Sequence, residues 1–514
     1  MNTAAQATAA LRRLLDFAEA RGLTPAEDRP YYLNLLLDAL RMDAPEEEEA
    51  STAAPVPETA TELLKEISAI AVNRGLIDDT QTDRELFSAR VMGLLTPSPR
   101  EVREDFAAAL AEKGAEAATD GFYQLCRSCD YIKVDAIAQN IRYFAPTEVG
   151  ELEITINLSK PEKDPREIAK LKNAPTVGYP RCMLCVENPG YAGRGNFPAR
   201  QNHRMIPLKL AGADWYLQYS PYAYYPEHCI VLNGQHVPMR IDAGTFDRLF
   251  AFVDQFPHYF LGSNADLPIV GGSILNHDHF QGGRHIFPMD NAEALCRLTS
   301  PVGGVQASLM NWPLTTLELS GTDAAALKRE AVRVLEAWRQ WSDAECDIIA
   351  FEEDGTPHNT ITPILRKKDG KYLLRLVLRN NRTTEEHPLG LFHPHAPLHH
   401  IKRENIGLIE VMGLFILPGR LKTELALLSG YLTGEKPLTY PAEDDPCAKH
   451  YPWLLEIAEK HGTSLTPAEA GGVLRQETAN VCAQVLRDAG VYKLDEKGVR
   501  GFLRFAESLG YGRA

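Results

Sequence analysis

Apolar spacing divides the chain into helical ends and a central region of short strands. Up to about residue 145, and again from about 440 to 514, apolar residues recur at the spacing of an amphipathic helix. Three segments begin with Ser or Thr, then Pro, then a glutamate placed to complete a capping box: Thr24-Pro25-x-Glu27, Ser98-Pro99-x-Glu101 and Thr466-Pro467-x-Glu469. Gly114 is a candidate helix end.

The central region predicts strands. Short runs that alternate or are rich in β-branched residues lie between turn residues: ELEITINLS, HRMIPLKL, DWYLQYSPYAYY, HCIVLN, ASLMNWPLTTLEL, HNTITPILRKKDGKYLLRLVLRNN and GLFHPHAPLHH. Helices are expected at about 243–256 and 323–342, and Lys368-Asp369-Gly370-Lys371 predicts a hairpin turn. His393-Pro394-His395 echoes His277-Asp278-His279, a pattern that two duplicated α/β halves would explain.

Composition narrows the class of protein. The chain has 514 residues, 44% of them hydrophobic and 24% charged, as in ordinary globular proteins. No apolar run reaches the ~18 residues of a membrane span, and the N-terminus lacks the apolar core of a signal peptide. The net charge of −15 argues against nucleic-acid or membrane-surface binding. We therefore expect a cytoplasmic protein.

Nine cysteines in a chain without an export signal are expected to be mostly reduced and buried. Cys126 and Cys129 lie in a helix-like segment and are interpreted as structural thiols. Cys182 and Cys185 have the two-residue gap with which two thiolates grip one tetrahedral zinc. His228, His236 and His277 are candidates for the remaining ligands. The alternative is a pair of buried or redox-active thiols.

The stretch VGGSILNHDHFQGGRH, residues 270–285, holds the strongest catalytic candidates. On an extended backbone His277, His279 and Gln281 share one face. A neutral histidine can attack phosphorus if its other nitrogen donates to a carbonyl, and a glutamine amide can donate to a phosphate oxygen. The flanking glycines would let phosphates approach the backbone. The alternative is that both histidines are metal ligands or polar core residues.

Two further groups are candidates for binding. Arg and Asn donors in RGNFPAR and NHR suit phosphate, and two lysines upstream could add charge: Arg194, Asn196, Arg200, Arg204, Lys160 and Lys163. Solvated loop charges are the alternative interpretation. A second histidine cluster has spacing that suits another metal, or else lines a substrate pocket: His358, His393, His395, His399 and His400.

Six stretches between about 150 and 421 carry a resemblance to a known family: GELEITINLSKPEKDP, CMLCVENPGYAGRGNFPARQNHR, QYSPYAYYPEHCIVLNGQHVPMRI, FLGSNADLPIVGGSILNHDHFQGGRH, PHNTITPI and HPLGLFHPHAPLHHIKRENIGLIEVMGLFILPGRL. They resemble the galactose-1-phosphate uridylyltransferases, specifically the long bacterial form called class II. The family belongs to the histidine-triad superfamily. The resemblance implies an α+β fold with duplicated histidine-triad-like halves and antiparallel sheets, divided as 1–145 helical, 146–300 first half, 301–430 second half and 431–514 helical.

The resemblance also implies a reaction and its residues. His279 would take a uridylyl group from UDP-glucose and pass it to galactose 1-phosphate, giving UDP-galactose, with Gln281 beside it. A structural zinc would be held by Cys182, Cys185, His236 and His277, and Ser273 joins the substrate-binding candidates. A second metal would use His358, His393 and His395, with Glu293 as a loose fourth candidate. HDH replaces the family's HPH, and Lys160 and Lys163 stand in for phosphate-binding arginines without a clear match.

Partners and alternatives follow from the same resemblance. The expected partners are UDP-sugars and hexose 1-phosphates, with a homodimer and without nucleic acid, membrane or organic cofactor. One alternative is a dinucleoside-polyphosphate phosphorylase or nucleotidyl hydrolase of the same superfamily. Another, of a different class, is a zinc-stabilised binding protein with purely structural histidines.

Overall fold

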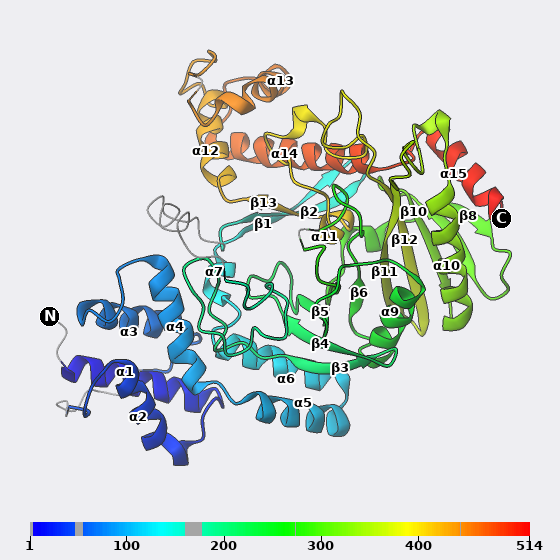
Figure 1. Cartoon of the computed structure of the whole chain (residues 1–514). Coiled ribbons are helices and arrows are strands. Elements are labelled where there is room, and N and C mark those ends of the chain that lie inside the picture. Colours follow the sequence, from blue (N-terminus) through cyan, green and yellow to red (C-terminus); the bar gives the residue numbers. More distant parts are fainter. Residues whose placement is uncertain (1–3, 47–54, 160–176, 273, 443, 514) are drawn as a thin grey trace. The chain divides into compact units, whose positions relative to one another are not determined.

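The computed structural model describes residues 4–46, 55–159, 177–272, 274–442 and 444–513. They form two units, each with its own set of elements (Figure 1). The first unit comprises residues 1–139, 159–223 and 227–237, and the second comprises 140–158, 224–226 and 238–514. Three separate chain segments therefore build each unit.

The first unit begins with helices and adds three antiparallel strands in the order β5-β4-β3. Its elements are α1 (Ala4–Ala20), η1 (Ala26–Asp28), α2 (Arg29–Ala39), α3 (Thr61–Asn73), α4 (Gln81–Leu95), α5 (Pro99–Lys113), α6 (Ala115–Ser128), α7 (Val134–Ala138), β3 (Ile206–Leu210), β4 (Ala213–Tyr219) and β5 (Cys229–Asn233). Helix α5 carries the predicted capping box of Ser98 and Glu101 and ends at Gly114 with φ 89°.

The second unit contains two sheets and the C-terminal helices. Its strands are β1 (Ile141–Thr147), β2 (Gly150–Asn157), β6 (Phe260–Gly262), β7 (His279–Gly283), β8 (Ala294–Thr299), β9 (Gln306–Met310), β10 (Thr316–Gly321), β11 (Asn359–Lys368), β12 (Lys371–Asn380), β13 (Leu414–Pro418) and β14 (Gly512–Arg513). Its helices are α9 (Ala243–Gln255), η2 (Pro288–Asn291), α10 (Ala324–Gln340), η3 (Ala344–Cys346), η4 (Ala396–Leu398), α11 (Leu408–Val411), α12 (Leu421–Leu432), η5 (Ala448–His450), α13 (Tyr451–His461), α14 (Pro467–Ala489) and α15 (Glu496–Ser508).

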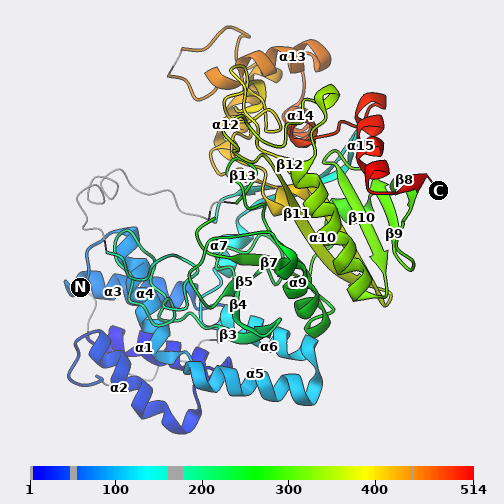
Figure 2. The same ribbon diagram turned by 45° about the vertical axis from the view of Figure 1, so that its right-hand side comes forward.

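The larger sheet of this unit runs β14-β8-β9-β10-β12-β11-β6-β7, with antiparallel neighbours. Helices α9 and α10 pack on one face of its central strands (Figure 2). The smaller sheet has the order β1-β2-β13 and packs with α12 and α14 in a common hydrophobic core that also includes Ile364 of β11 and Val377 of β12. Strands β11 and β12 are almost wholly buried because both of their faces are covered.

The order of elements repeats along the chain. Three strands, one helix and two strands follow one another from β3 to β7, and the same order returns from β8 to β12. This order agrees with the predicted α+β fold in two halves. The predicted hairpin turn also forms, with Lys368 paired to Lys371 and positive φ at Asp369 and Gly370.

Two predicted features are wrong. GLFHPHAPLHH is not a strand: it forms turns and the short helix η4. Gly390 has φ 125° there, and the backbone N–H of His395 donates to the Asp488 side chain instead of a neighbouring strand. Thr24 does not cap a helix, because the chain passes through η1 before α2 begins at Arg29.

Candidate active site

His279 opens strand β7 and has its tautomer set by the backbone. Its side chain is 5% exposed. Nδ1–H donates to the carbonyl oxygen of His277 at 2.8 Å, so the lone pair of a neutral imidazole remains on Nε2. Burial lowers the pKa of His279 to about 4. The ring is therefore neutral near pH 7 and has the electron pair that a nucleophile needs.

Strand β7 divides its side chains between a chemical face and a core face. His279 and Gln281 are two residues apart on the strand and so point to the same side. Phe280 points the other way and is fully buried. Asp278, where the family pattern has proline, lies 3.9 Å from Arg248 of α9. The prediction that His277 lies on this strand is wrong, because the strand begins two residues later, at His279. The expected pair of His279 and Gln281 on one face is present.

The glycines before the histidines serve close packing. A Cβ on Gly271 would lie 2.6 Å from the carbonyl oxygens of Ala265 and Leu267. A Cβ on Gly272 would lie 2.6 Å from the amide nitrogen of Asn264. Real Cβ atoms do not make contacts this short. Glycine at these two positions therefore leaves room for the neighbouring atoms of residues 264–267, independently of any bound phosphate.

The CxxC loop of the first unit gathers three possible metal ligands. Cys182 Sγ lies 3.4 Å from Cys185 Sγ, which lies 3.0 Å from Nδ1 of His236. The backbone N–H of Leu184 points to Cys182 Sγ at 3.4 Å, and the Asn188 amide donates to the carbonyls of Cys182 and Cys185. His236, rather than His228, is therefore the histidine beside the cysteines. His277 belongs to the second unit.

The donor set fits a soft divalent cation. Cys182 and Cys185 are not joined in a disulfide. Burial, and then the neighbouring Cys182, raise the pKa of Cys185 to about 12, and a bound cation would reverse this by stabilising the thiolate. These residues belong to a group whose ligand atoms lie within 4.8 Å of one another. The group could bind a metal.

Arg194 and Asn196 organise their own loop. Arg194 donates to the Asn196 side chain, to the Tyr191 hydroxyl and to the carbonyls of Tyr179 and Val177. Its guanidinium also lies over the ring of Phe197, 4.9 Å from the centroid. Most of its donors are thus engaged with other residues of the loop around 177–197.

Arg204 and Arg200 differ in their partners. Arg204 is buried and donates to the carbonyls of Thr96 and Pro97 after α4, and to those of Gln201 and His203. These bonds give Arg204 a structural role in the first unit. Arg200 is half-buried and lies over the ring of Tyr131, 5.7 Å from the centroid. Lys160, Lys163 and Ser273, which were also expected to bind substrate, lie outside the described residues.

The histidines expected to hold a second metal have other partners. His358 contacts Asn381 and Glu352, and His395 stacks on His387 with 4.0 Å between centroids. His393 contacts the carbonyl of Pro394. Within the described part of the chain they do not form a group of metal ligands with one another or with Glu293.

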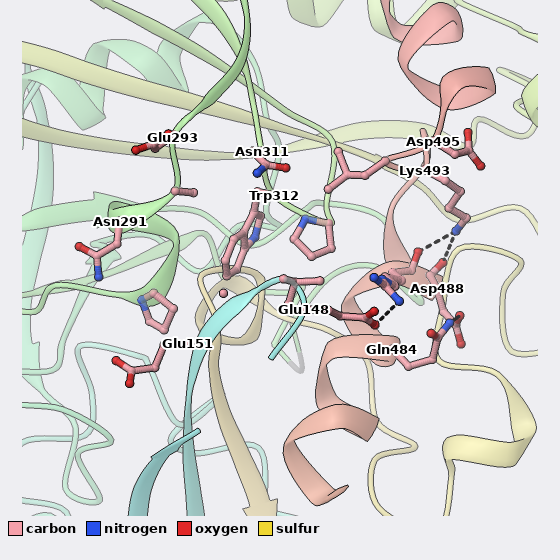
Figure 3. Close-up of a pocket in the computed structure, with 17 residues that line it drawn as sticks. Glu148, Glu151, Asn291, Glu293, Asn311, Trp312, Gln484, Asp488, Lys493 and Asp495 are labelled. Carbon is pink, nitrogen blue, oxygen red and sulfur yellow. Dashed lines mark hydrogen bonds and ion pairs between the residues drawn. The ribbon is translucent and has the colours of Figure 1, made fainter. Parts of the chain in front are cut away.

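Glu293 instead lines a cavity of about 910 Å³ near the C-terminal end of α14 (Figure 3). Arg487 pairs there with Glu148 of the β1–β2 turn. The Lys493 ammonium donates to the carbonyls of Arg487, Asp488 and Gly490. The two basic side chains that line this cavity, Arg487 and Lys493, are thus bonded to other residues of its wall or next to it.

One group of buried polar side chains was missed. Glu424, His450 and His400 form a buried hydrogen-bonded chain in the second unit. His400 belonged to the predicted second histidine cluster, but Glu424 and His450 are distant from it in sequence and follow no recognisable spacing. Only the packing of α12 and η5 brings them together.

The chain is similar to proteins of one named family along most of its length. Family models described as "Galactose-1-phosphate uridyl transferase, N-terminal domain" and "C-terminal domain" match residues 36–238 and 252–432. A galactose-1-phosphate uridylyltransferase of Caldanaerobacter subterraneus is 50% identical over 512 residues, covering 98% of each chain. One of Bacillus subtilis is 48% identical over 503 residues, covering 97% of each.

Among solved structures, yeast Ap4A phosphorylase Apa2 aligns with 69% of this chain and 98% of its own, at 13% identity and a TM-score of 0.31.

Among the described residues, no helix has the length and apolar character needed to cross a membrane.

Proposed function

Because the chain belongs to the galactose-1-phosphate uridylyltransferase family, we propose that it transfers uridylyl from UDP-glucose to galactose 1-phosphate. The products are glucose 1-phosphate and UDP-galactose. The observation that carries the mechanism is the hydrogen bond from His279 Nδ1 to the His277 carbonyl, which leaves Nε2 as the free base.

The reaction takes place in two displacements at one phosphorus. Nε2 of His279 attacks the α-phosphorus of UDP-glucose, a nitrogen–phosphorus bond forms, and the bond to the oxygen of glucose 1-phosphate breaks. A phosphate oxygen of galactose 1-phosphate then attacks the same phosphorus and displaces the imidazole. Gln281, on the same strand face, donates to a non-bridging oxygen as charge moves onto it. No net proton is taken up or released by His279.

We propose zinc as the metal of the CxxC loop, with Cys182, Cys185 and His236 as ligands. His277 is proposed as the fourth ligand on the strength of the family resemblance. When bound, the zinc would hold the thiolates deprotonated and fix the position of the loop. His277 also supplies the carbonyl that orients His279, so its backbone position matters to the nucleophile.

Isotope exchange tests the double displacement. The protein is incubated with UDP-glucose and labelled glucose 1-phosphate, without galactose 1-phosphate. Label is expected to enter UDP-glucose, because the first displacement is reversible and needs no acceptor. In a separate incubation with UDP-glucose labelled in its uridylyl group, label should remain on the wild-type chain and be absent from His279→Gly. A chain that makes UDP-galactose without exchange would contradict the covalent route, and a chain that does neither would fit a binding protein.

Compartment and assembly are also proposals. We propose that the enzyme works in the cytoplasm, where UDP-sugars are made and used, and that it forms a homodimer. Light scattering of the purified protein measures the second point, with a mass near twice 57.1 kDa expected.

A further inference from the structure

A hydrogen-bonded chain of three buried side chains lies at the base of a cavity that the proposed transfer does not use. Glu424 is on α12, His450 ends η5 and His400 follows η4. His450 Nε2 lies 2.9 Å from Glu424 Oε2, and its Nδ1 lies 2.8 Å from Nδ1 of His400. The exposed fractions are 0% for His450, 5% for Glu424 and 8% for His400.

The hydrogen bonds between Glu424, His450 and His400 fix which ring nitrogen of each histidine carries its proton. Although burial opposes ionisation of Glu424, hydrogen bonds from Lys449 and His450 hold its pKa below the usual range. Burial lowers the pKa of His400 to about 3 and also lowers that of His450. A carboxylate only accepts, so His450 Nε2–H donates to Glu424 and His450 Nδ1 is left as an acceptor. His400 Nδ1–H must then donate to His450, and Nε2 of His400 keeps its lone pair.

That lone pair belongs to a wall of a cavity of about 770 Å³ lined by residues of η4, α13 and α14. In the part of the chain that the structure describes, Nε2 of His400 has no hydrogen-bond partner. This nitrogen, on a nine-tenths buried imidazole, can accept a hydrogen bond from a ligand in the cavity, such as one with a hydroxyl group.

The other walls add an aromatic surface and positive charge. Trp453 is half-buried and its ring lies 5.0 Å from that of His400. Arg403 is exposed, and its guanidinium has no ion pair among the described residues. Lys449 also lines the cavity, 2.5 Å from Glu424. Of the two glutamates on the wall, Glu477 is already paired with Lys460 and His461, 2.7 Å and 2.9 Å away.

We propose that this cavity is a second ligand site, for a phosphorylated sugar. A sugar ring lies on the Trp453 indole, one hydroxyl donates to His400 Nε2, and the phosphate binds Arg403. None of the residues that line the cavity belongs to the His277–Gly283 stretch. The site is therefore separate from the nucleophile and does not depend on the proposed reaction.

Calorimetric titration of the full chain tests this site with glucose 6-phosphate, glucose and inorganic phosphate as three separate probes. Glucose 6-phosphate is expected to bind more tightly than either part alone. Arg403→Gln should weaken its binding roughly tenfold by removing a charge-assisted hydrogen bond, and Trp453→Phe should weaken it as well. Arg500→Gln is the matched control, because Arg500 is an exposed arginine of α15 that pairs with Glu496.

A second titration separates the cavity from the transfer site. In His279→Gly with excess UDP-glucose, glucose 6-phosphate should bind as it does to the wild type. Blocked binding would place the ligand in the transfer site and overturn the proposal. So would the absence of binding, or affinity unchanged in both Arg403→Gln and Trp453→Phe. Equal affinity for inorganic phosphate and glucose 6-phosphate would rule out the sugar contact.

Discussion

A single carbonyl oxygen decides what His279 can do. The HxHxQ spacing is compatible with a histidine nucleophile, but it is equally compatible with two histidines that bind a metal. The bond from Nδ1 to the His277 carbonyl, together with burial, makes the ring a neutral acceptor at Nε2. Gln281 then lies two residues along the same strand, where its amide can meet charge that develops on the phosphate.

Gln281→Ala therefore tests the role of this amide. Loss of one donor to a developing oxyanion lowers kcat by about 100-fold, while His279 can still form the covalent intermediate given time. Pre-steady-state mixing with labelled UDP-glucose should show slow but complete labelling of the chain. His279→Gly in the same experiment should show none. Rapid labelling at the wild-type rate in Gln281→Ala would remove the glutamine from the first displacement.

At the scale of elements, identical sequence signals had different outcomes. Thr24-Pro25-x-Glu27 and Thr466-Pro467-x-Glu469 cannot be told apart by pattern, yet only the second forms a capping box, at the start of α14. Helix α1 and its turn place Thr24 in the interior, where packing overrides the local signal. In the same way GLFHPHAPLHH alternates like a strand, but a bond from His395 to Asp488, far along the chain, holds it in turns.

The substitution Thr→Val should consequently lower the stability of the fold at Thr466 but not at Thr24. Thr466 Oγ1 accepts from the Glu469 N–H, so Thr466→Val loses a cap that stabilises by about 1 kcal/mol. Thr24 Oγ1 is buried without a hydrogen-bond partner among the described residues, so Thr24→Val removes a desolvation cost and should be neutral or stabilising. Thermal unfolding of both variants measures the difference, and a larger loss in Thr24→Val would contradict it.

The CxxC loop gives a second test at this scale. Hydrogen bonds from the Asn188 amide and the Leu184 N–H hold its turn, and the two thiols and His236 lie close together there. We expect one zinc per chain by mass spectrometry of the metal content. Cys182→Ser and His236→Asn should lose most of it, whereas His228→Asn, the alternative histidine, should retain it. Equal metal content in all four proteins would place the zinc elsewhere.

At the scale of the whole molecule, sequence predicted the class of fold and the strand face that His279 and Gln281 share. It did not predict the hydrogen bonds that join Glu424, His450 and His400, because these residues come from three separated segments and meet only through the packing of α12 and η5. Nor could it separate arginines that hold carbonyls, such as Arg204, from arginines that face solvent. Hydrogen-bond partners decide that difference, and they depend on tertiary contacts.

Buried neutral histidines are spread through both units and make the folded chain sensitive to acid. Burial lowers the pKa of His203 well below its ordinary value, and that of His393 and His450 as well. These groups take up protons only on unfolding, when their pKa returns to about 6.5. Stability is therefore expected to fall as the pH drops below that value, by up to about 1.4 kcal/mol per pH unit for each histidine.

His203→Phe tests this argument at one position. His203 is fully buried, stacks on Tyr131 with 4.5 Å between centroids, and has no hydrogen-bond partner at either ring nitrogen among the described residues. A phenyl ring can keep the stack without binding a proton in the unfolded state. Between pH 7.5 and 5.5 the variant should lose less of its Tm than the wild type. Tyr131→Phe, which alters the other ring of the stack and leaves His203 in place, should keep the wild-type pH dependence. Equal losses of Tm in His203→Phe and the wild type would mean that protonation of His203 is not a source of acid sensitivity.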